Sequence, residues 1–113
     1  MPLINNIQLN PTVRGTLVSP AVTPLVRSNG NRAYVLFINV SSDNVWVLPS
    51  EAVTVSGGFF IPPNGGVLSF SYLSDFLLPS SAWFAISSGA ASEIIIIDQV
   101  ISPRRGSSEE ENV

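Results

Sequence analysis

The chain has 113 residues, of which 45% are hydrophobic and 12% are charged, and its formal net charge is −3. This length suits one domain, and the apolar content is ample for a core, which excludes a disordered chain. Charged residues usually make up about 25% of a soluble domain. The surface is therefore either rich in Ser and Asn or partly buried against neighbours, and we favour the second interpretation.

The residue types that are missing restrict the chemistry. The sequence contains no cysteine, histidine or lysine, and all five cations are arginines. Without cysteine, these residues can form no disulfide and no thiolate. Without histidine, they lack the commonest general base and metal ligand. A serine nucleophile has neither His nor Lys to activate it. We predict a protein that is not an enzyme and that uses no metal or cofactor.

Charge and hydropathy also limit the partners. A net charge of −3 with few cations does not favour binding to nucleic acid, which depends on clustered cations. No apolar run approaches the ~18 to 20 residues that span a membrane. The residues before Arg14 lack the basic start of a secretory signal. We therefore expect no nucleic acid or membrane partner, and a protein that is made in a cytoplasm and used as it stands.

Residues 1–27 carry four prolines. Proline fixes φ and removes a backbone donor, which disfavours a helix here. The segment is either a terminus with one or two edge strands or an extended arm that docks on the domain or on a neighbouring subunit, because proline is tolerated at edges. We take it as an extended, proline-rich N-terminal arm.

Residues 32–49 predict two strands around the short polar turn 41–44, that is, a hairpin. The first strand does not alternate between apolar and polar residues. A sandwich strand normally shows one face to the core and one to water, but here both faces are apolar. We expect a second layer, the arm or another subunit to cover the outer face. The candidate interface residues are Tyr34, Leu36 and Ile38 of this strand and Leu3, Ile4, Ile7 and Leu9 of the arm.

The rest of the chain repeats the pattern of short apolar runs separated by Gly, Pro, Ser and Asn. Strands are predicted at 52–55, 59–61, 67–72, 82–87 and 93–101, and 74–81 could hold one helical turn. The four isoleucines at 94–97 predict a strand buried on both faces. This spacing predicts an all-β protein, an antiparallel β-sandwich or jelly roll over 28–102, followed by a polar, flexible C-terminal tail over 103–113.

Aromatic side chains raise the alternative of a sugar-binding site. Sandwiches can bind sugars by stacking them on exposed aromatics beside amide and carboxylate groups, here Asp43 and Asn44. Each aromatic, however, lies in an apolar run, where a core or interface position is the competing interpretation. The candidates for glycan stacking are Trp46, Trp83 and Tyr72.

The sequence RAYVLFINVS at 32–41, followed by VWV at 45–47, resembles small β-rich virion proteins of tailed bacteriophages. So do the later Gly-Gly turn, FFI, PPNGG and the closing run 93–100, and the likeness extends over residues 30–101. The resemblance implies a jelly-roll accessory unit without catalytic residues. It would decorate or cement capsids, commonly as a trimer, or sit on tails and fibres.

From this resemblance we expect a non-enzymatic capsid decoration protein, bound as a homotrimer to the major capsid protein or other virion proteins. Cyclic C3 symmetry would make its contacts heterologous and ring-closing. Its location would be the virion. The alternative is a receptor- or glycan-binding module of a phage tail or fibre.

Overall fold

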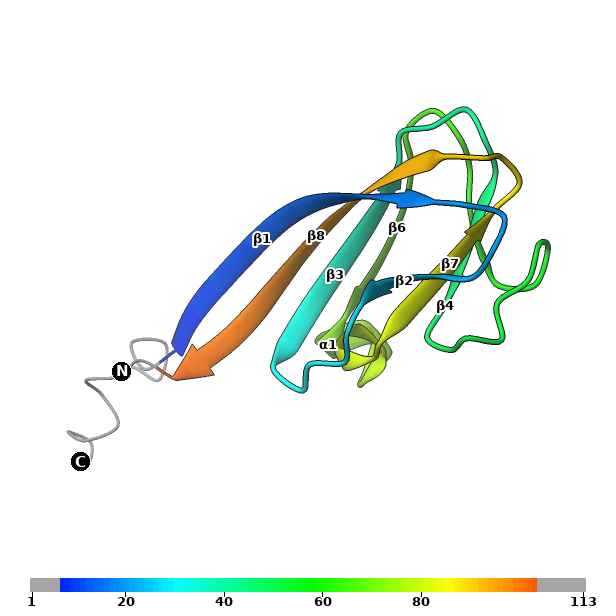
Figure 1. Ribbon diagram of the computed structural model, residues 1–113. Helices are drawn as coiled ribbons and strands as arrows, with labels where there is room; N and C mark the ends of the chain where they lie inside the picture. Colours follow the sequence, from blue (N-terminus) through cyan, green and yellow to red (C-terminus); the bar gives the residue numbers. More distant parts are fainter. Residues whose placement is uncertain (1–6, 104–113) are drawn as a thin grey trace, which may run out of the picture.

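The computed structural model of the chain describes residues 7–103, and the side chains of residues 11–101. The chain forms two antiparallel four-stranded sheets that pack face to face (Figure 1). The first sheet has the order β1 (Ile7–Val18), β8 (Ser92–Pro103), β3 (Arg32–Asn39) and β6 (Gly66–Ser71). The second has the order β2 (Thr23–Val26), β7 (Trp83–Ser87), β4 (Val45–Leu48) and β5 (Phe59–Ile61). The predicted all-β, antiparallel sandwich is confirmed, and the eight strands in two sheets have the arrangement of a jelly roll.

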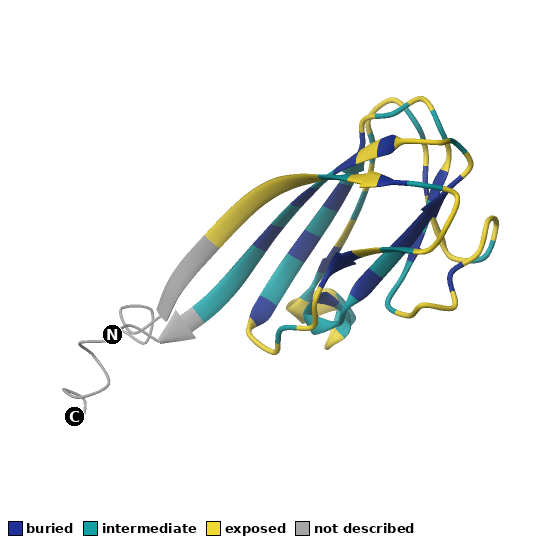
Figure 2. Ribbon diagram, in the orientation of Figure 1, coloured by how far each residue is buried: buried dark blue, intermediate teal, exposed yellow. Residues whose placement is uncertain are grey.

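The core forms because alternate residues of both sheets are large, apolar and turned inward (Figure 2). Phe37 of β3 and Trp83 of β7 face each other across the sandwich, with ring centroids 5.3 Å apart. Phe70 of β6 stacks on the same indole at 4.8 Å. The fully buried aliphatic side chains around these rings include Val35, Val45, Val47, Ile61, Ile94 and Ile96.

The predicted hairpin over 32–49 is wrong, because its two strands lie in different sheets. β3 pairs with β6 and β8, whereas β4 pairs with β5 and β7. The connection is directed by Asn39, which is fully buried at the end of β3. Its Nδ2 donates to the carbonyl oxygens of Asp43 at 2.8 Å and Ile61 at 3.0 Å. The amide therefore holds the chain as it crosses from one sheet to the other.

The boundary predicted after residue 27 also differs from the structure. β1 and β2 are edge strands of the two sheets, so residues 7–26 belong to the sandwich. The register of β1 against β8 runs from Ile7↔Pro103 to Val18↔Ser92. Of the two alternatives for this segment, the edge strands are the ones observed over the described residues, where Pro11 and Pro24 lie in edge strands and Pro20 in a loop. Residues 1–6, and all of the predicted tail after 103, lie outside the described residues.

Two connections complete the fold. The strand predicted at 52–55 is a turn with one isolated bridge between Thr54 and Gly57, because Ser56 takes a positive φ of 70° between them. The helical turn expected in the 74–81 connection is present as α1 (Tyr72–Asp75) and the 3-10 turn η2 (Leu78–Ser80). Over residues 7–103, no helix is long and apolar enough to cross a membrane.

Candidate functional site

The sheet β1-β8-β3-β6 has an apolar surface on the side that faces away from the core. Cross-strand pairing places Val13, Ile97 and Leu36 in one row, and Ile95, Ile38 and Val67 in the next. Their neighbours along each strand point into the core, so these side chains point outward. We call the following six residues the outer face: Val13, Leu36, Ile38, Val67, Ile95 and Ile97.

No described element covers the outer face, since the second sheet packs on the opposite side (Figure 1). Val13 is 67% exposed and Val67 is 55% exposed, and the four residues between them are half-buried by their own neighbours. The second layer and the arm, which were two of the covers expected from sequence, are not found over this face in residues 7–103.

The predicted interface residues are only partly assembled at this face. Tyr34, Leu36 and Ile38 project outward from β3 and are half-buried. Ile7 and Leu9 lie in β1, but their side chains are outside the described part of the chain, as are Leu3 and Ile4 altogether. The contributions of Ile95 and Ile97 were missed as site residues. The signal was present, because a run of four isoleucines in a strand must turn two of them away from the core.

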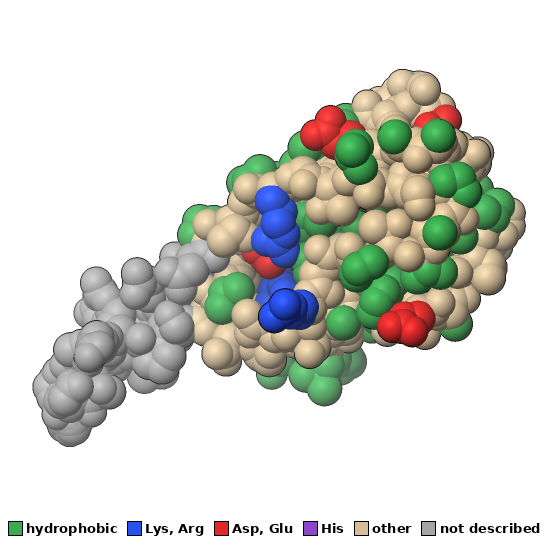
Figure 3. Space-filling model, viewed as in Figure 1, with side chains coloured by type: hydrophobic (Ala, Val, Ile, Leu, Met, Phe, Trp, Pro, Cys, Tyr) green, Lys and Arg blue, Asp and Glu red, His purple; other side chains and the backbone are tan. Residues whose placement is uncertain are grey.

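A second apolar surface projects from the end of the sandwich. Four large hydrophobic side chains in the β6–β7 connection are strongly exposed, and Figure 3 shows hydrophobic side chains at the lower edge of the molecule, where α1 lies in Figure 1. We call these four residues the knob: Tyr72 (57% exposed), Leu73 (91%), Phe76 (77%) and Leu77 (71%).

Hydrogen bonds fix the backbone of the knob. The Ser71 hydroxyl accepts from the Ser74 amide at 3.3 Å, and the Asp75 carboxylate accepts from the Ser71 amide at 2.9 Å. The Phe76 amide donates to the Tyr72 carbonyl oxygen at 3.1 Å and closes α1. Phe76 itself has φ 55° and ψ −116°, a backbone conformation that is costly for a residue with a Cβ. The exposed side chains are therefore held in defined positions rather than on a loose loop.

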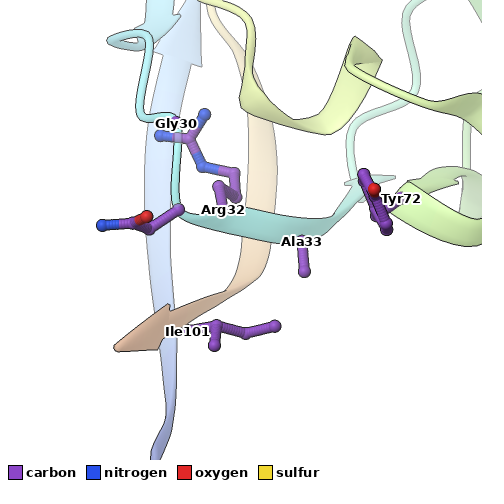
Figure 4. A pocket seen from close by; sticks show the side chains of 6 residues that line it. Gly30, Arg32, Ala33, Tyr72 and Ile101 are labelled. Atoms are coloured by element: carbon purple, nitrogen blue, oxygen red, sulfur yellow. The ribbon is translucent and has the colours of Figure 1, made fainter. Parts of the chain in front are cut away.

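A shallow hollow lies between the knob and the lower end of the first sheet (Figure 4). The side chains of Ala33 and Ile101 project toward the same side, and Tyr72 stands across from them. The Arg32 side chain extends away from this opening, toward the interior of the sandwich. The hollow thus offers a small, mostly apolar surface, and the guanidinium of Arg32, its one charged lining residue, is engaged with Asp98.

The three residues proposed for glycan stacking do not form a common platform. Trp83 is fully buried, and its Nε1 donates to the Leu78 carbonyl oxygen at 3.1 Å. Trp46 lies on the outside of the second sheet beside Phe60, at a ring distance of 5.6 Å. Tyr72 belongs to the knob. Trp83 therefore takes the core position that was the competing interpretation, because its ring fills the centre of the core.

A buried ion pair closes one end of the sandwich. Arg32 is 6% exposed and Asp98 is 3% exposed, and Arg32 Nε donates to Asp98 Oδ2 at 2.9 Å. The other guanidinium nitrogens donate to the carbonyl oxygens of Arg27 (2.8 Å), Pro79 (3.2 Å) and Ser81 (3.1 Å). The guanidinium therefore ties β3 to β8, to the end of β2 and to η2. These contacts satisfy the arginine within the fold, so the pair is structural.

A chain of hydroxyl groups joins the loops at the opposite end. The Ser87 and Ser92 hydroxyls are 2.5 Å apart, and Ser92 donates to Asp43 Oδ2 at 2.9 Å. The Gly89 amide donates to the Ser87 hydroxyl at 2.9 Å. Asp43 is thus engaged by the fold rather than presented to a sugar. Within residues 7–103 no group of three or more acidic side chains is placed to hold a metal ion.

The fold and its surfaces define a jelly-roll sandwich with an uncovered apolar sheet face and a hydrophobic knob. No protein-family model and no curated protein matches the sequence. A solved structure described as Bacillus endospore appendages, a novel family of disulfide-linked pili, is similar with a TM-score of 0.57. The likeness covers 88% of this chain and 90% of that chain at 13% sequence identity, so it concerns the fold alone.

This finding corrects the function expected from sequence. The structure that resembles the chain comes from a bacterial appendage rather than from a phage head or tail. The interpretation as a phage capsid decoration protein, with its phage-tail alternative, is therefore contradicted. The pattern of apolar runs and Asn, Gly and Pro positions that suggested it is shared by jelly rolls of many kinds, because it reflects the fold.

Proposed function

We propose that this protein is a non-enzymatic structural subunit that assembles with copies of itself, as a building block of a filamentous appendage outside the cell. The observation that carries the proposal is the outer face of the first sheet, whose two adjacent cross-strand rows carry six aliphatic side chains together with Ser69 and Gly15, and which no described element covers. Monomeric soluble proteins rarely expose apolar patches larger than a few hundred Å² without a partner.

The size of the face supports a contact with a neighbour. Four strands about 4.8 Å apart, over two rows that each take up two residues at about 3.3 Å, outline roughly 250 Å². Burying that area contributes about 6 kcal/mol at ~25 cal/mol per Å². Association costs about 4 to 15 kcal/mol in lost freedom. One such contact is therefore marginal alone, which favours an assembly in which each subunit has several contacts.

The fold neighbour agrees with a self-assembling role, since it is described as forming pili. It is also described as disulfide-linked, whereas the 113 residues of this chain contain no cysteine. The contacts that we propose are therefore non-covalent. A reducing agent should leave the assembly intact, and a denaturant should dissociate it.

Native mass spectrometry and negative-stain electron microscopy of the purified chain, over a range of concentrations, test the proposal. We expect oligomers or filaments that grow with concentration. A double variant of the outer face, Ile38→Thr with Ile95→Thr, should remain monomeric, because it keeps β-branched side chains but adds polar groups. Val55→Thr is the matched control, since Val55 is 49% exposed and lies in the β4–β5 connection.

The number of subunits in each observed oligomer distinguishes a filament from a closed ring. A series of lengths supports the open filament, and a single species of three subunits would support the trimer predicted from sequence. A wild-type chain that stays monomeric at every concentration would contradict the proposal.

A further inference from the structure

We propose that the knob of one copy packs on the outer face of the next copy, so that the contact between subunits is heterologous. This inference rests on the proposed self-assembly and specifies how it is built. A heterologous contact joins two different surfaces and propagates into a filament unless the rotation closes a ring.

The two surfaces have matching chemistry. The only charged residue between positions 72 and 81 is Asp75, whose carboxylate is turned back to the Ser71 amide. The two central rows of the outer face contain no charged residue; the carboxylate of Glu93, which pairs with Leu17 in the next row, lies over Gly15 at the β1 edge of the second row. Two copies with the same net charge can therefore bring these surfaces together without placing like charges in contact.

The strained backbone at Phe76 is a second argument that the knob binds a partner. Phe76 holds a positive φ of 55° with its side chain 77% exposed. Such a conformation is strained in a residue with a Cβ, and glycine would adopt it freely. In the isolated subunit, an exposed ring does little to offset this cost. A partner that buries the ring supplies the missing stabilisation.

The areas of the two surfaces are comparable. At ~200 Å² for each aromatic side chain, the exposed fractions of Tyr72 and Phe76 leave roughly 250 Å² uncovered. Leu73 and Leu77 add to this, so the knob is large enough to cover the roughly 250 Å² outline of the face. Their contact lies at the low end of specific interfaces, which predicts assembly that depends strongly on concentration.

A contact between the knob and the outer face is favoured over a contact between two identical surfaces, because it leaves less apolar surface exposed. Knob against knob leaves every outer face exposed, and face against face leaves every knob exposed. A single type of contact covers both surfaces of each interior copy only if the knob meets the face. Within one copy the knob begins directly after β6, beyond the pair Tyr34↔Ser71, and the two rows of the outer face lie further along the strands.

Mixing two defective variants tests this geometry. The knob variant is Phe76→Gly with Leu77→Ser, and the face variant is Ile38→Thr with Ile95→Thr. Each should weaken self-association by about tenfold or more, the loss expected when a buried anchor is truncated. An equimolar mixture, with one variant isotope-labelled, should form heterodimers and nothing longer in native mass spectra. Failure of the mixture to form heterodimers, with both variants folded, would overturn the inference.

Thermal unfolding of the monomers separates a lost contact from a lost fold. Phe76→Gly should unfold at the same or a higher temperature than wild type, since glycine relieves the strained backbone. Leu73→Ser changes a side chain that is 91% exposed, and it provides a second knob variant without a backbone effect. If the wild type and both knob variants assemble equally well, the inference fails while self-assembly stands. If the wild type itself never assembles, both fail.

Discussion

At the scale of single residues, one buried ion pair shows that two of the few charged residues in this sequence stabilise the fold. Arg32 and Asp98 stand 66 positions apart and meet inside the sandwich at 2.9 Å. Sequence analysis placed them in a strand and near the end of another, but nothing in their spacing indicated a pair. Their contact depends on β3 and β8 being neighbours and on η2 offering its carbonyl oxygens. Such non-local partners cannot be read from local pattern.

Removing one member of this pair should strongly destabilise the subunit. Arg32→Ala leaves the Asp98 carboxylate buried without its main cationic partner, and we expect a loss of about 3 to 5 kcal/mol in the free energy of unfolding. Urea denaturation followed by tryptophan fluorescence measures it, because Trp83 lies in the core. The control is Arg27→Ala, at an exposed position, which should change stability by no more than about 0.5 kcal/mol. Equal losses in the two variants would refute the structural role of the pair.

Two glycines provide a second test at this scale. A Cβ on Gly89 would lie 2.0 Å from Asp43 Oδ2, which the Ser92 hydroxyl holds in place. Gly89→Ala should therefore cost about 1 to 3 kcal/mol, as overpacking does. A Cβ on Gly30 meets nothing within 4 Å, so Gly30→Ala should be close to neutral. Thermal unfolding of both variants compares them directly, and a neutral Gly89→Ala would show that the two loops are not packed as described.

At the scale of elements, composition located most strands but not their partners. Val, Ile and Phe runs bounded by Gly, Pro and Asn identified β3 to β8 within a residue or two. The turn at 41–44 was interpreted as a hairpin because a short polar connection favours one. The buried Asn39 amide, which directs the crossing, has the same sequence signature as a turn residue. The segment 52–55 was mistaken for a strand because propensity does not report the positive φ at Ser56.

The outer face was partly predictable from the sequence. A strand without alternation shows that both faces need cover, whether or not the partner is known. The knob was not predicted as a site, since Tyr72 was considered only for sugar stacking and Phe76 and Leu77 were assigned to a connection. Its exposure follows from how α1 and η2 fold at the end of the sandwich, where Pro79 of η2 is buried. That is a property of tertiary packing.

The isoleucine run of β8 tests the assignment of faces. Ile96 is fully buried opposite Phe37, whereas Ile97 points to the outer face and is half-buried. Ile96→Ala should lower the free energy of unfolding by about 2 to 5 kcal/mol. Ile97→Ala should cost less than half of that in the monomer, and it should weaken self-association instead. Chemical denaturation and sedimentation velocity report the two quantities, and a reversed order would mean that the register of β8 is wrong.

At the scale of the whole molecule, the surfaces that we assign to assembly are apolar and neutral. Their attraction should therefore follow the hydrophobic effect rather than charge. We expect self-association to survive an increase in sodium chloride, to strengthen in sulfate and to weaken on cooling. Sedimentation velocity in these solvents measures the response. Dissociation of the assembly by moderate sodium chloride would instead indicate contacts between charged groups.

The position of β8 has a consequence for the timing of synthesis. It is the last of the described strands to leave the ribosome, yet it lies between β1 and β3 in the first sheet. Until it arrives, β1 and β3 have no common neighbour, and the core lacks Ile94 and Ile96. Pairing the two ends of the chain is also a slow, non-local step. The first sheet, and with it the outer face, therefore cannot be completed until translation has passed β8, which delays assembly until that strand has been made.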